Sequence, residues 1–332
     1  MTRAMVLGKF MPPHRGHLYL AEFAGHFADE LCVVVGSLPS EPIDGAQRVR
    51  WMRELVPGAT VVHLDEVLPQ LPHEDPAFWS LWTAALNRVL PWPVDLVFAG
   101  ENYGVTLAAK LGARFVPVPR GSAVSARGTE IREDPMAHWH ELPRCVRPYF
   151  VRKVAIVGPE STGKSTLART LAQHFDTAFV PEHARALIES REVPTVDEHD
   201  MVEIARGQRA AEFALARNAN RVLICDTDAL TTCVWSERLF GRVAQALTEW
   251  ATHDRYDLTL CCAPDVPYVP DTVRFLPGES EAFLQRILGA LDLHKRSNVV
   301  RLTGDFATRE RTAIAAVTAL VEAKPRPTEP AR

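Results

Sequence analysis

The sequence lacks the features that mark membrane, secreted and disulfide-stapled proteins. Its 332 residues contain no apolar run near the ~18 residues that a membrane span needs, and no charged leader precedes an apolar core at its start. The six cysteines form no C-x-x-C pair, and several lie in apolar runs, where cysteine acts as a small hydrophobe. These absences favour a soluble protein of a reducing, cytoplasmic setting with no membrane partner.

An excess of positive charge is also missing. The net charge is −4 and the pI is about 6.3, so the totals show no nucleic-acid surface, and we expect no nucleic-acid partner. A local basic cleft for phosphate remains compatible with these totals. No internal repeat is visible, and the length predicts two domains of about 100–200 residues each. The sequence leaves open whether the chain forms a homo-oligomer.

Short apolar runs alternate with helical patterns along both halves of the chain. This alternation predicts an α/β fold with a parallel sheet in each half. The expected strands are residues 4–8, 31–36, 60–64, 94–99, 114–118, 153–157, 177–181, 221–226, 257–262 and 298–302. The expected helices are residues 17–28, 46–56, 76–90, 103–111, 163–175, 195–219 and 306–322. Thr195-x-x-Glu198 has capping-box spacing and predicts where the helix 195–219 begins.

A segment with two prolines and mixed polarity, residues 139–150, separates the halves. It predicts a first domain over residues 1–147 and a second over residues 151–322. Residues 323–332 are rich in proline and charge and are expected to form a disordered tail.

GPESTGKST, which begins at Gly158, matches G-x-x-x-x-G-K-[ST] and lies between an apolar strand pattern and a helical pattern. In such a loop, backbone N–H groups surround phosphate oxygens, and the helix N-terminus adds about half a positive charge. Lys164 reaches the terminal phosphates, and the Ser165 hydroxyl can ligate Mg²⁺. The predicted ATP-binding residues are Gly158, Glu160, Ser161, Thr162, Gly163, Lys164, Ser165 and Thr166. The chain is short for a motor ATPase and lacks a water-positioning glutamine switch, so phosphoryl transfer to a small molecule is the simpler prediction.

Acidic residues follow two expected strands of the second half. Asp226 is the natural second Mg²⁺ ligand, with a helix N-cap as its alternative role, and Asp228 is the better N-cap candidate. Glu182 could accept a proton or hydrogen bond from a sugar hydroxyl, because substrates bind beyond the carboxyl ends of parallel strands. Its alternative is a first-turn acid favoured by the helix dipole. Arg274 is either a lid residue over the transferred phosphate or a solvated arginine.

Two histidines, His14 and His17, bracket Arg15-Gly16 between a strand pattern and a helical pattern. Metal ligation would need further ligands, and none lies nearby in the sequence. General-base chemistry would need only one imidazole. Two imidazole N–H groups at a helix start, with the Gly16 backbone, suit donation to polyphosphate oxygens and to departing pyrophosphate.

GKFMPPHRGH, from Gly8 to His17, resembles the G-x-F-x-P-x-H-x-G-H signature of nucleotidylyltransferases. Those enzymes have a Rossmann-like fold and join a nucleoside monophosphate to another phosphate. RGTEIR resembles their second signature, Ser/Thr-x-Thr-x-Ile-Arg, except that Arg127 replaces the first Ser/Thr. The resemblance implies an ATP site formed by Gly8, Lys9, Phe10, His14, His17, Thr129 and Arg132.

The order of the two halves, a histidine signature followed by a P-loop, is similar to that of the NadR family. Its members combine a nicotinamide-nucleotide adenylyltransferase with a ribosylnicotinamide kinase. Matching segments in the same order are FAGENYG (98–104), VRPYF (146–150), EHAR (182–185), ARGQ (205–208), DTD (226–228) and PYVPD (267–271). Some members carry a helix-turn-helix domain in front; this chain starts at the adenylyltransferase strand, so we expect no DNA binding. The fold implied is a Rossmann-like nucleotidyltransferase domain followed by a P-loop kinase domain.

The resemblance implies two consecutive steps, with ATP as co-substrate and Mg²⁺ as cofactor. The second half would phosphorylate the 5′-hydroxyl of nicotinamide riboside, and the first half would adenylylate the resulting nicotinamide mononucleotide (NMN) to NAD and pyrophosphate. Neither step needs a covalent enzyme intermediate. The expected catalytic residues are His14, His17, Lys164, Asp226 and Glu182. The expected riboside contacts are Glu182, Arg185, Asp226 and Asp228, and the expected NMN contacts are Arg48, Glu101, Tyr103 and Trp79. Trp82 is an alternative to Trp79, with helical core packing expected for at least one of the two.

Two other functions are compatible with the same motifs. A different pocket shape would select another small metabolite, such as pantetheine phosphate with dephospho-CoA as product; the EHAR, DTD and PYVPD segments favour NMN. The second alternative is a nucleotide-sensing regulator with a weakened adenylyl site. Arg127 in the altered signature favours it, whereas the intact histidine pair and Lys164 argue for retained chemistry.

Overall fold

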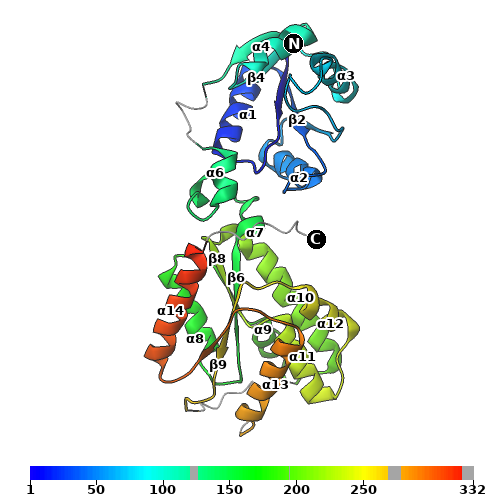
Figure 1. Ribbon diagram of the computed structural model, residues 1–332. Helices are drawn as coiled ribbons and strands as arrows, with labels where there is room; N and C mark the ends of the chain where they lie inside the picture. The colour runs from blue at the N-terminus through cyan, green and yellow to red at the C-terminus, as the bar shows by residue number, and fades with distance from the viewer. Residues whose placement is uncertain (120–125, 194, 268–277, 324–332) are drawn as a thin grey trace. The chain divides into compact units, whose positions relative to one another are not determined.

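The computed structural model describes residues 1–119, 126–193, 195–267 and 278–323 (Figure 1). Within them the chain forms two compact units: an N-terminal unit, residues 1–146, and a C-terminal unit, residues 147–323. Each unit has its own five-stranded parallel sheet, in agreement with the predicted α/β class. The lid candidate Arg274 and most of the predicted tail lie outside the described residues. Within the described ranges, no helix has both the length and the apolar composition that crossing a bilayer demands.

The sheet of the N-terminal unit has the strand order β3-β2-β1-β4-β5. Its strands are β1 (Arg3–Gly8), β2 (Glu30–Gly36), β3 (Thr60–Leu64), β4 (Leu96–Ala99) and β5 (Arg114–Pro117). Its helices are α1 (Arg15–Phe27), α2 (Gly45–Leu55), α3 (Phe78–Val89), α4 (Tyr103–Leu111) and α6 (Gly128–Glu133), followed by the 3₁₀ turn η1 (Trp139–Glu141). Chain order reverses between β1 and β4, and ligands bind such sheets in the crevice at the carboxyl ends of the strands at this point. The histidine signature follows β1 and therefore lies at that crevice.

The sheet of the C-terminal unit has the order β10-β9-β6-β8-β7. Its strands are β6 (Arg152–Val157), β7 (Phe179–Val180), β8 (Val222–Asp226), β9 (Leu258–Cys262) and β10 (Val299–Leu302). Its helices are α7 (Arg147–Phe150), α8 (Lys164–His174), α9 (His183–Glu189), α10 (Glu198–Leu215), η2 (Ala216–Asn218), α11 (Ala229–Phe240), α12 (Gln245–His253), α13 (Ser280–Leu293) and α14 (Phe306–Glu322). The P-loop leaves the central strand β6, so it too opens at the carboxyl edge of a sheet.

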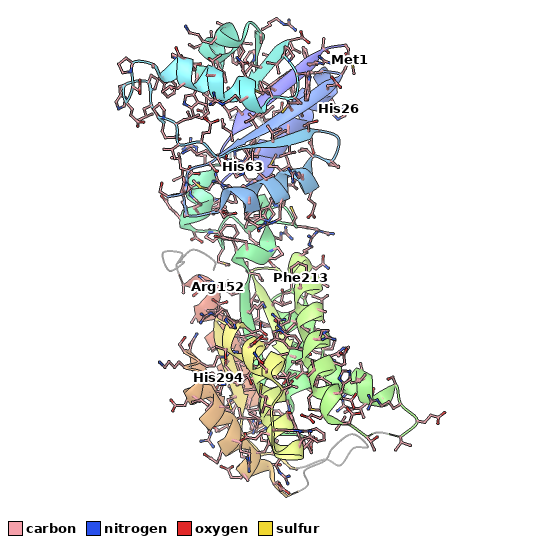
Figure 2. The ribbon with its side chains drawn as sticks, turned by 90° about the vertical axis from the view of Figure 1, so that its right-hand side faces the viewer. Met1, His26, His63, Arg152, Phe213 and His294 are labelled. Carbon is pink, nitrogen blue, oxygen red and sulfur yellow. The ribbon has the colours of Figure 1, made fainter. Side chains whose placement is uncertain are left out.

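Side chains fill the space between each sheet and its helices (Figure 2). Along β6 they alternate between the two faces of the sheet. Val154 and Ile156 pack under α8 and α14, whereas Ala155 and Val157 pack under α10, α11 and α13 on the other face. Figure 1 shows these helices on opposite sides of the sheet. Because both faces are covered, the strands consist of nearly continuous apolar runs, which is why they were predictable.

The first turn of α10 differs from the prediction. Asp197, rather than Thr195, is the N-cap: its side chain accepts from the Asp200 N–H at 3.0 Å, and the Asp200 carboxylate accepts from the Asp197 N–H at 2.7 Å. The predicted Thr195–Glu198 box is therefore wrong. The same spacing occurs two residues later, and the ion pair between Asp200 and Arg191 favours the later start.

We expect Asp197→Ala to lower the free energy of unfolding by about 1 kcal/mol, because the N–H of Asp200 loses its acceptor. Urea unfolding followed by circular dichroism measures the change. Thr195→Ala is the matched control and should change this free energy by less than about 0.5 kcal/mol. Equal losses in the two variants would contradict the observed cap.

Candidate active sites

A cavity of about 680 Å³ opens at the carboxyl edge of the N-terminal sheet. Its walls contain most of the residues predicted for ATP and NMN, namely Gly8, Lys9, Phe10, His17, Thr129, Arg132, Trp79, Glu101 and Tyr103. Trp82 also lines it, with its indole N–H bonded to the Pro69 carbonyl at 2.8 Å. The two other predicted residues, His14 and Arg48, are buried and do not form part of these walls.

The histidine pair is held together at the start of α1. The Nδ1 of His14 accepts from the Gly16 N–H at 3.1 Å and caps the helix, so a neutral His14 ring carries its proton on Nε2. The rings of His14 and His17 lie 3.8 Å apart between centroids, and the Phe10 ring packs edge-on to His17 at 4.9 Å. His17 is thus the imidazole at the cavity wall, and His14 supports it from behind.

Glu41 is a cavity residue that sequence analysis missed. Its carboxylate accepts from the Lys9 ammonium at 2.8 Å and from the Arg48 guanidinium at 2.6 Å. Burial acts to raise the pKa of Glu41, but hydrogen bonds from Lys9, the Leu38 amide and Arg48 lower it overall. Arg48 also donates to the Lys9 carbonyl at 2.9 Å, so it fixes the turn after β1. The sequence did contain a signal for Glu41: it is an acidic residue that follows β2, at the same edge of the sheet as Lys9.

The second nucleotidylyltransferase signature lies on α6, beside the histidine turn. Arg132 donates to the Met11 carbonyl and to the Thr129 hydroxyl, the latter at 3.2 Å, so the two signatures are joined directly. Burial lowers the pKa of Arg132, because the cation loses water. Arg127, at the altered position, is exposed and pairs with Glu130 at 3.3 Å, away from the cavity wall.

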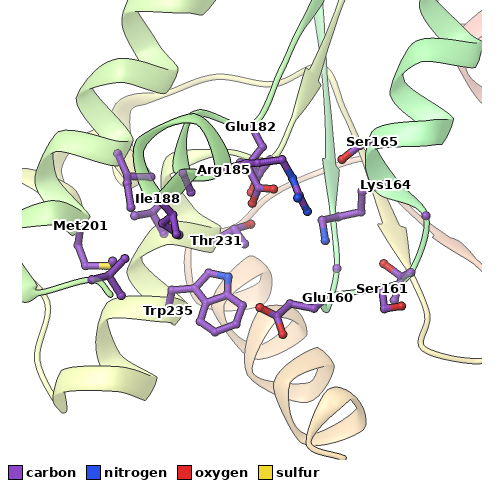
Figure 3. Close-up of a pocket in the computed structure, with 18 of the residues that line it drawn as sticks. Glu160, Ser161, Lys164, Ser165, Glu182, Arg185, Ile188, Met201, Thr231 and Trp235 are labelled. Atoms are coloured by element: carbon purple, nitrogen blue, oxygen red, sulfur yellow. The ribbon is translucent and has the colours of Figure 1, made fainter. Parts of the chain in front are cut away.

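A second cavity, of about 360 Å³, lies at the carboxyl edge of the C-terminal sheet (Figure 3). All eight P-loop residues predicted to bind ATP form part of its wall: Gly158, Glu160, Ser161, Thr162, Gly163, Lys164, Ser165 and Thr166. Glu182 and Arg185 line it as well, and Figure 3 shows them converging with Lys164 on one part of the cavity. The structure therefore brings together the loop that follows β6 and the turn that follows β7.

The P-loop backbone needs its glycines. Gly158 has φ +144°, and a Cβ there would lie 2.6 Å from the Cys262 carbonyl oxygen. The Thr162 hydroxyl donates to the Pro159 carbonyl at 2.8 Å, and Arg309 from α14 donates to the Thr162 carbonyl at 3.0 Å. The loop is thus held in its curved form from within and from α14.

Two carboxylates accompany the P-loop, of which Glu182 is half-buried and Asp226 is buried. Burial raises the pKa of Glu182 and of Asp226, and the positive charge of Lys164 opposes both shifts. Asp226, at the end of β8, is 1% exposed and bonds to the Ser165 hydroxyl, and its Oδ1 has no hydrogen-bond partner within the described ranges. These oxygens are the kind of donors that a hard divalent cation takes.

Asp228 has the capping role that was considered for it. Its Oδ1 accepts from the Thr231 N–H and hydroxyl, each at 2.8 Å, at the start of α11. Its Oδ2 lies 3.7 Å from the Arg296 guanidinium. The carboxylate faces these groups, and neither it nor the carboxylate of Asp226 is part of the cavity wall. The riboside contacts expected for both residues stay predictions.

Eleven further wall residues were missed, among them Arg169, Thr227, Thr231, Thr232 and Trp235. The Trp235 indole projects from α11 into the cavity (Figure 3), one helical turn beyond Thr231. The sequence signal for these residues was the DTD segment, because a helix that begins after it starts at the carboxyl edge of the sheet and can line the site. Its residues at i and i+4 share one face.

The two sites define the class of protein: a Rossmann-like nucleotidyltransferase unit joined to a P-loop kinase-like unit, each with a phosphate-binding turn after its central strand. Residues 153–309 match the AAA domain family. The chain is 30% identical over 300 residues to the trifunctional NAD biosynthesis/regulator protein NadR of Escherichia coli (strain K12), covering 83% of this chain and 72% of that one.

Two solved structures resemble the whole chain. A crystal structure of NadR protein in complex with NR has a TM-score of 0.80 at 23% identity and covers 98% of both chains. A crystal structure of NadR protein in complex with NAD and AMP-PNP has a TM-score of 0.76 at 25% identity and covers 98% of this chain and 97% of that one. The chain belongs to the NadR family.

Proposed function

We propose that this protein catalyses two consecutive steps of NAD biosynthesis, with ATP as co-substrate of both. The C-terminal unit phosphorylates nicotinamide riboside to NMN, and the N-terminal unit adenylylates NMN to NAD with release of pyrophosphate. One observation carries the proposal: a NadR-family chain has two cavities, each walled by its own phosphate-binding signature. Small molecules are the partners this function requires.

In the kinase step, the P-loop amides and Lys164 bind the terminal phosphates of ATP. The riboside 5′-hydroxyl attacks the γ-phosphorus in line, and a carboxylate, that of Glu182 or Asp226, accepts its proton. Burial raises the pKa of both, which makes each a stronger base. Arg185, which points into the same part of the cavity as Lys164, stabilises the charge that develops on the transferred group (Figure 3).

Mg²⁺ fits the donors of this site. When bound with ATP it neutralises phosphate charge, and the Ser165 hydroxyl and the Asp226 carboxylate would hold it. The described ranges contain no cluster of three or more His, Cys, Asp or Glu suited to a metal. This agrees with a cation that takes most of its ligands from phosphate and water, as Mg²⁺ does in phosphoryl-transfer sites.

In the adenylyl step, the NMN phosphate attacks the α-phosphorus of ATP and pyrophosphate leaves. Lys9, His17 and Arg132, which all line the cavity, donate to the polyphosphate. Glu41 and Arg48 keep the Lys9 ammonium in place. Trp79 or Trp82 offers an aromatic face to the nicotinamide ring.

We place these reactions in a reducing, cytoplasmic compartment. The six cysteines are all buried, and burial raises the pKa of Cys32 and Cys233 to about 12. Thiols with such a pKa stay protonated and resist oxidation.

We expect purified protein with Mg²⁺, ATP and nicotinamide riboside to form NMN and then NAD, because both sites have their phosphate-binding groups. Chromatography should find one ADP for each riboside phosphorylated and one pyrophosphate for each NAD. With NMN in place of riboside, NAD and pyrophosphate should form without ADP. ADP release that is independent of riboside, or formation of dephospho-CoA from pantetheine phosphate, would overturn this function.

A further inference from the structure

Gln208 on α10 joins the two carboxylate-bearing turns of the kinase site. Its side chain is 1% exposed. Its Oε1 accepts from the His183 N–H at 3.0 Å, at the start of α9, and its Nε2 donates to the Asp226 carbonyl at 3.2 Å, at the end of β8. One partner can only donate and the other can only accept, so the orientation of the amide is determined.

The two backbone groups that Gln208 binds adjoin the reacting side chains. His183 directly follows Glu182, and the Asp226 carbonyl belongs to the peptide that leads into Thr227. Thr227 lines the cavity with φ +77°, a conformation that a β-branched residue rarely adopts and that neighbouring contacts must maintain. The Gln208 amide supplies one such contact, and the bond from the Thr227 N–H to the Ile156 carbonyl at 3.0 Å supplies another.

The neighbouring residue on α10 strengthens the same connection. A Cβ on Gly207 would lie 2.1 Å from the His183 ring, so the imidazole packs directly against the α10 backbone. The turn after β7 is therefore fixed to α10 through two adjacent residues. On the other side, Gln208 connects α10 to β8. Between the described residues of these two elements, its bond to Asp226 is the only side-chain hydrogen bond.

We propose that Gln208 is a positioning residue of the kinase site: its amide sets the spacing between the turn of Glu182 and the end of β8. The riboside hydroxyl is thereby held between the two carboxylates and in line with the γ-phosphate. The inference rests on the proposed kinase function. We treat ATP binding as separate, because the hydrogen bonds that hold the P-loop carbonyls of Pro159 and Thr162 come from the loop itself, from Lys164 of α8 and from Arg309 of α14.

The test compares two variants of the full chain in steady-state kinase assays with ATP and nicotinamide riboside. Gln208→Met keeps the volume and removes both hydrogen bonds. Gln208→Glu has a carboxylate that can accept from the His183 N–H but cannot donate to the Asp226 carbonyl. A displacement of about 1 Å at a reacting group costs about 10²-fold in rate. We therefore expect kcat to fall about 10²-fold in Gln208→Met and by at least tenfold in Gln208→Glu.

The Michaelis constants separate positioning from folding. The KM for riboside should rise at least about fivefold in both variants, while the KM for ATP stays within about twofold of the wild type. Partial unfolding lowers kcat through the fraction of active enzyme and changes neither KM. Gln173→Ala, which removes an exposed glutamine from α8, is the matched control and should equal the wild type in all three constants.

Three results would overturn the proposal: wild-type constants in Gln208→Met, a lower kcat with both KM values unchanged, or wild-type behaviour of Gln208→Glu. If Gln208→Met does not fold, Gln208→Glu, which retains the size and one hydrogen bond, decides alone. If the wild type forms no NMN, the proposed kinase function fails instead.

Discussion

Replacing Lys164 with alanine is expected to lower NMN formation about 10³-fold or more and to leave the conversion of added NMN to NAD unchanged. Lys164 lines the P-loop cavity, and its charge opposes the raised pKa of both Glu182 and Asp226. An arginine finger that stabilises the transferred phosphoryl group is worth about 10³–10⁵ in rate, and we expect an effect of similar size for the Lys164 ammonium, which acts on the same charge. The adenylyl cavity has its own lysine, Lys9, and should not respond.

Both activities are measured on the same preparation, so the second reports on folding. Lys295→Ala, which removes an exposed lysine following α13, is the control and should leave both rates intact. A parallel fall of the two activities in Lys164→Ala would contradict a protein with two separate sites.

The complementary variant, His17→Ala, should lower NAD formation from NMN by about 10²–10³-fold and leave riboside phosphorylation unchanged. His17 is the imidazole at the wall of the N-terminal cavity, oriented by the rings of His14 and Phe10. Loss of one oriented donor to a developing charge typically has this effect. Pyrophosphate release with NMN and ATP as substrates is the measurement.

His26 provides the matched control because it lies on the same helix, α1, and is exposed. His26→Ala should retain the wild-type rate of NAD formation. An effect of His17→Ala below about tenfold would assign His17 to packing with Phe10 instead of charge stabilisation.

The two sites share the same local structure for binding phosphate. In each unit a phosphate-binding turn follows the central strand, β1 or β6, and leads into a helix whose N-terminus faces the cavity. Aligned backbone N–H groups supply positive potential there, and a lysine completes it. The units differ in the side chains beside the phosphate-binding turn: imidazole and guanidinium groups in the first, carboxylates in the second.

Local patterns account for the parts of the sites that were predicted. The P-loop and the histidine signature each place their groups within a few residues, so spacing alone brings them to one turn. All eight predicted P-loop residues line the second cavity. Every predicted strand and helix is present, with ends within two residues except for the helix expected over residues 195–219, which spans Glu198–Leu215.

The sequence was less informative where partners distant along the chain decide the contacts of a side chain. Arg48, for which an NMN contact stays a prediction, is fully buried and donates to the Lys9 carbonyl 39 residues away. The helices α9, α11, α12 and α13 were not predicted. In α11 most residues are buried, so its apolar pattern lacks the polar face from which an amphipathic helix is recognised.

The sequence by itself determined the two sheets, the two phosphate-binding turns and the family, because strand periodicity and loop signatures are local and depend on neighbours a few residues apart. Only the tertiary structure decided which side chains meet across those turns. Glu41 meets Lys9, Trp235 reaches the P-loop cavity, and Gln208 bridges two turns 18 and 25 residues away. Such contacts depend on how strands and helices pack, and spacing along the chain does not encode them.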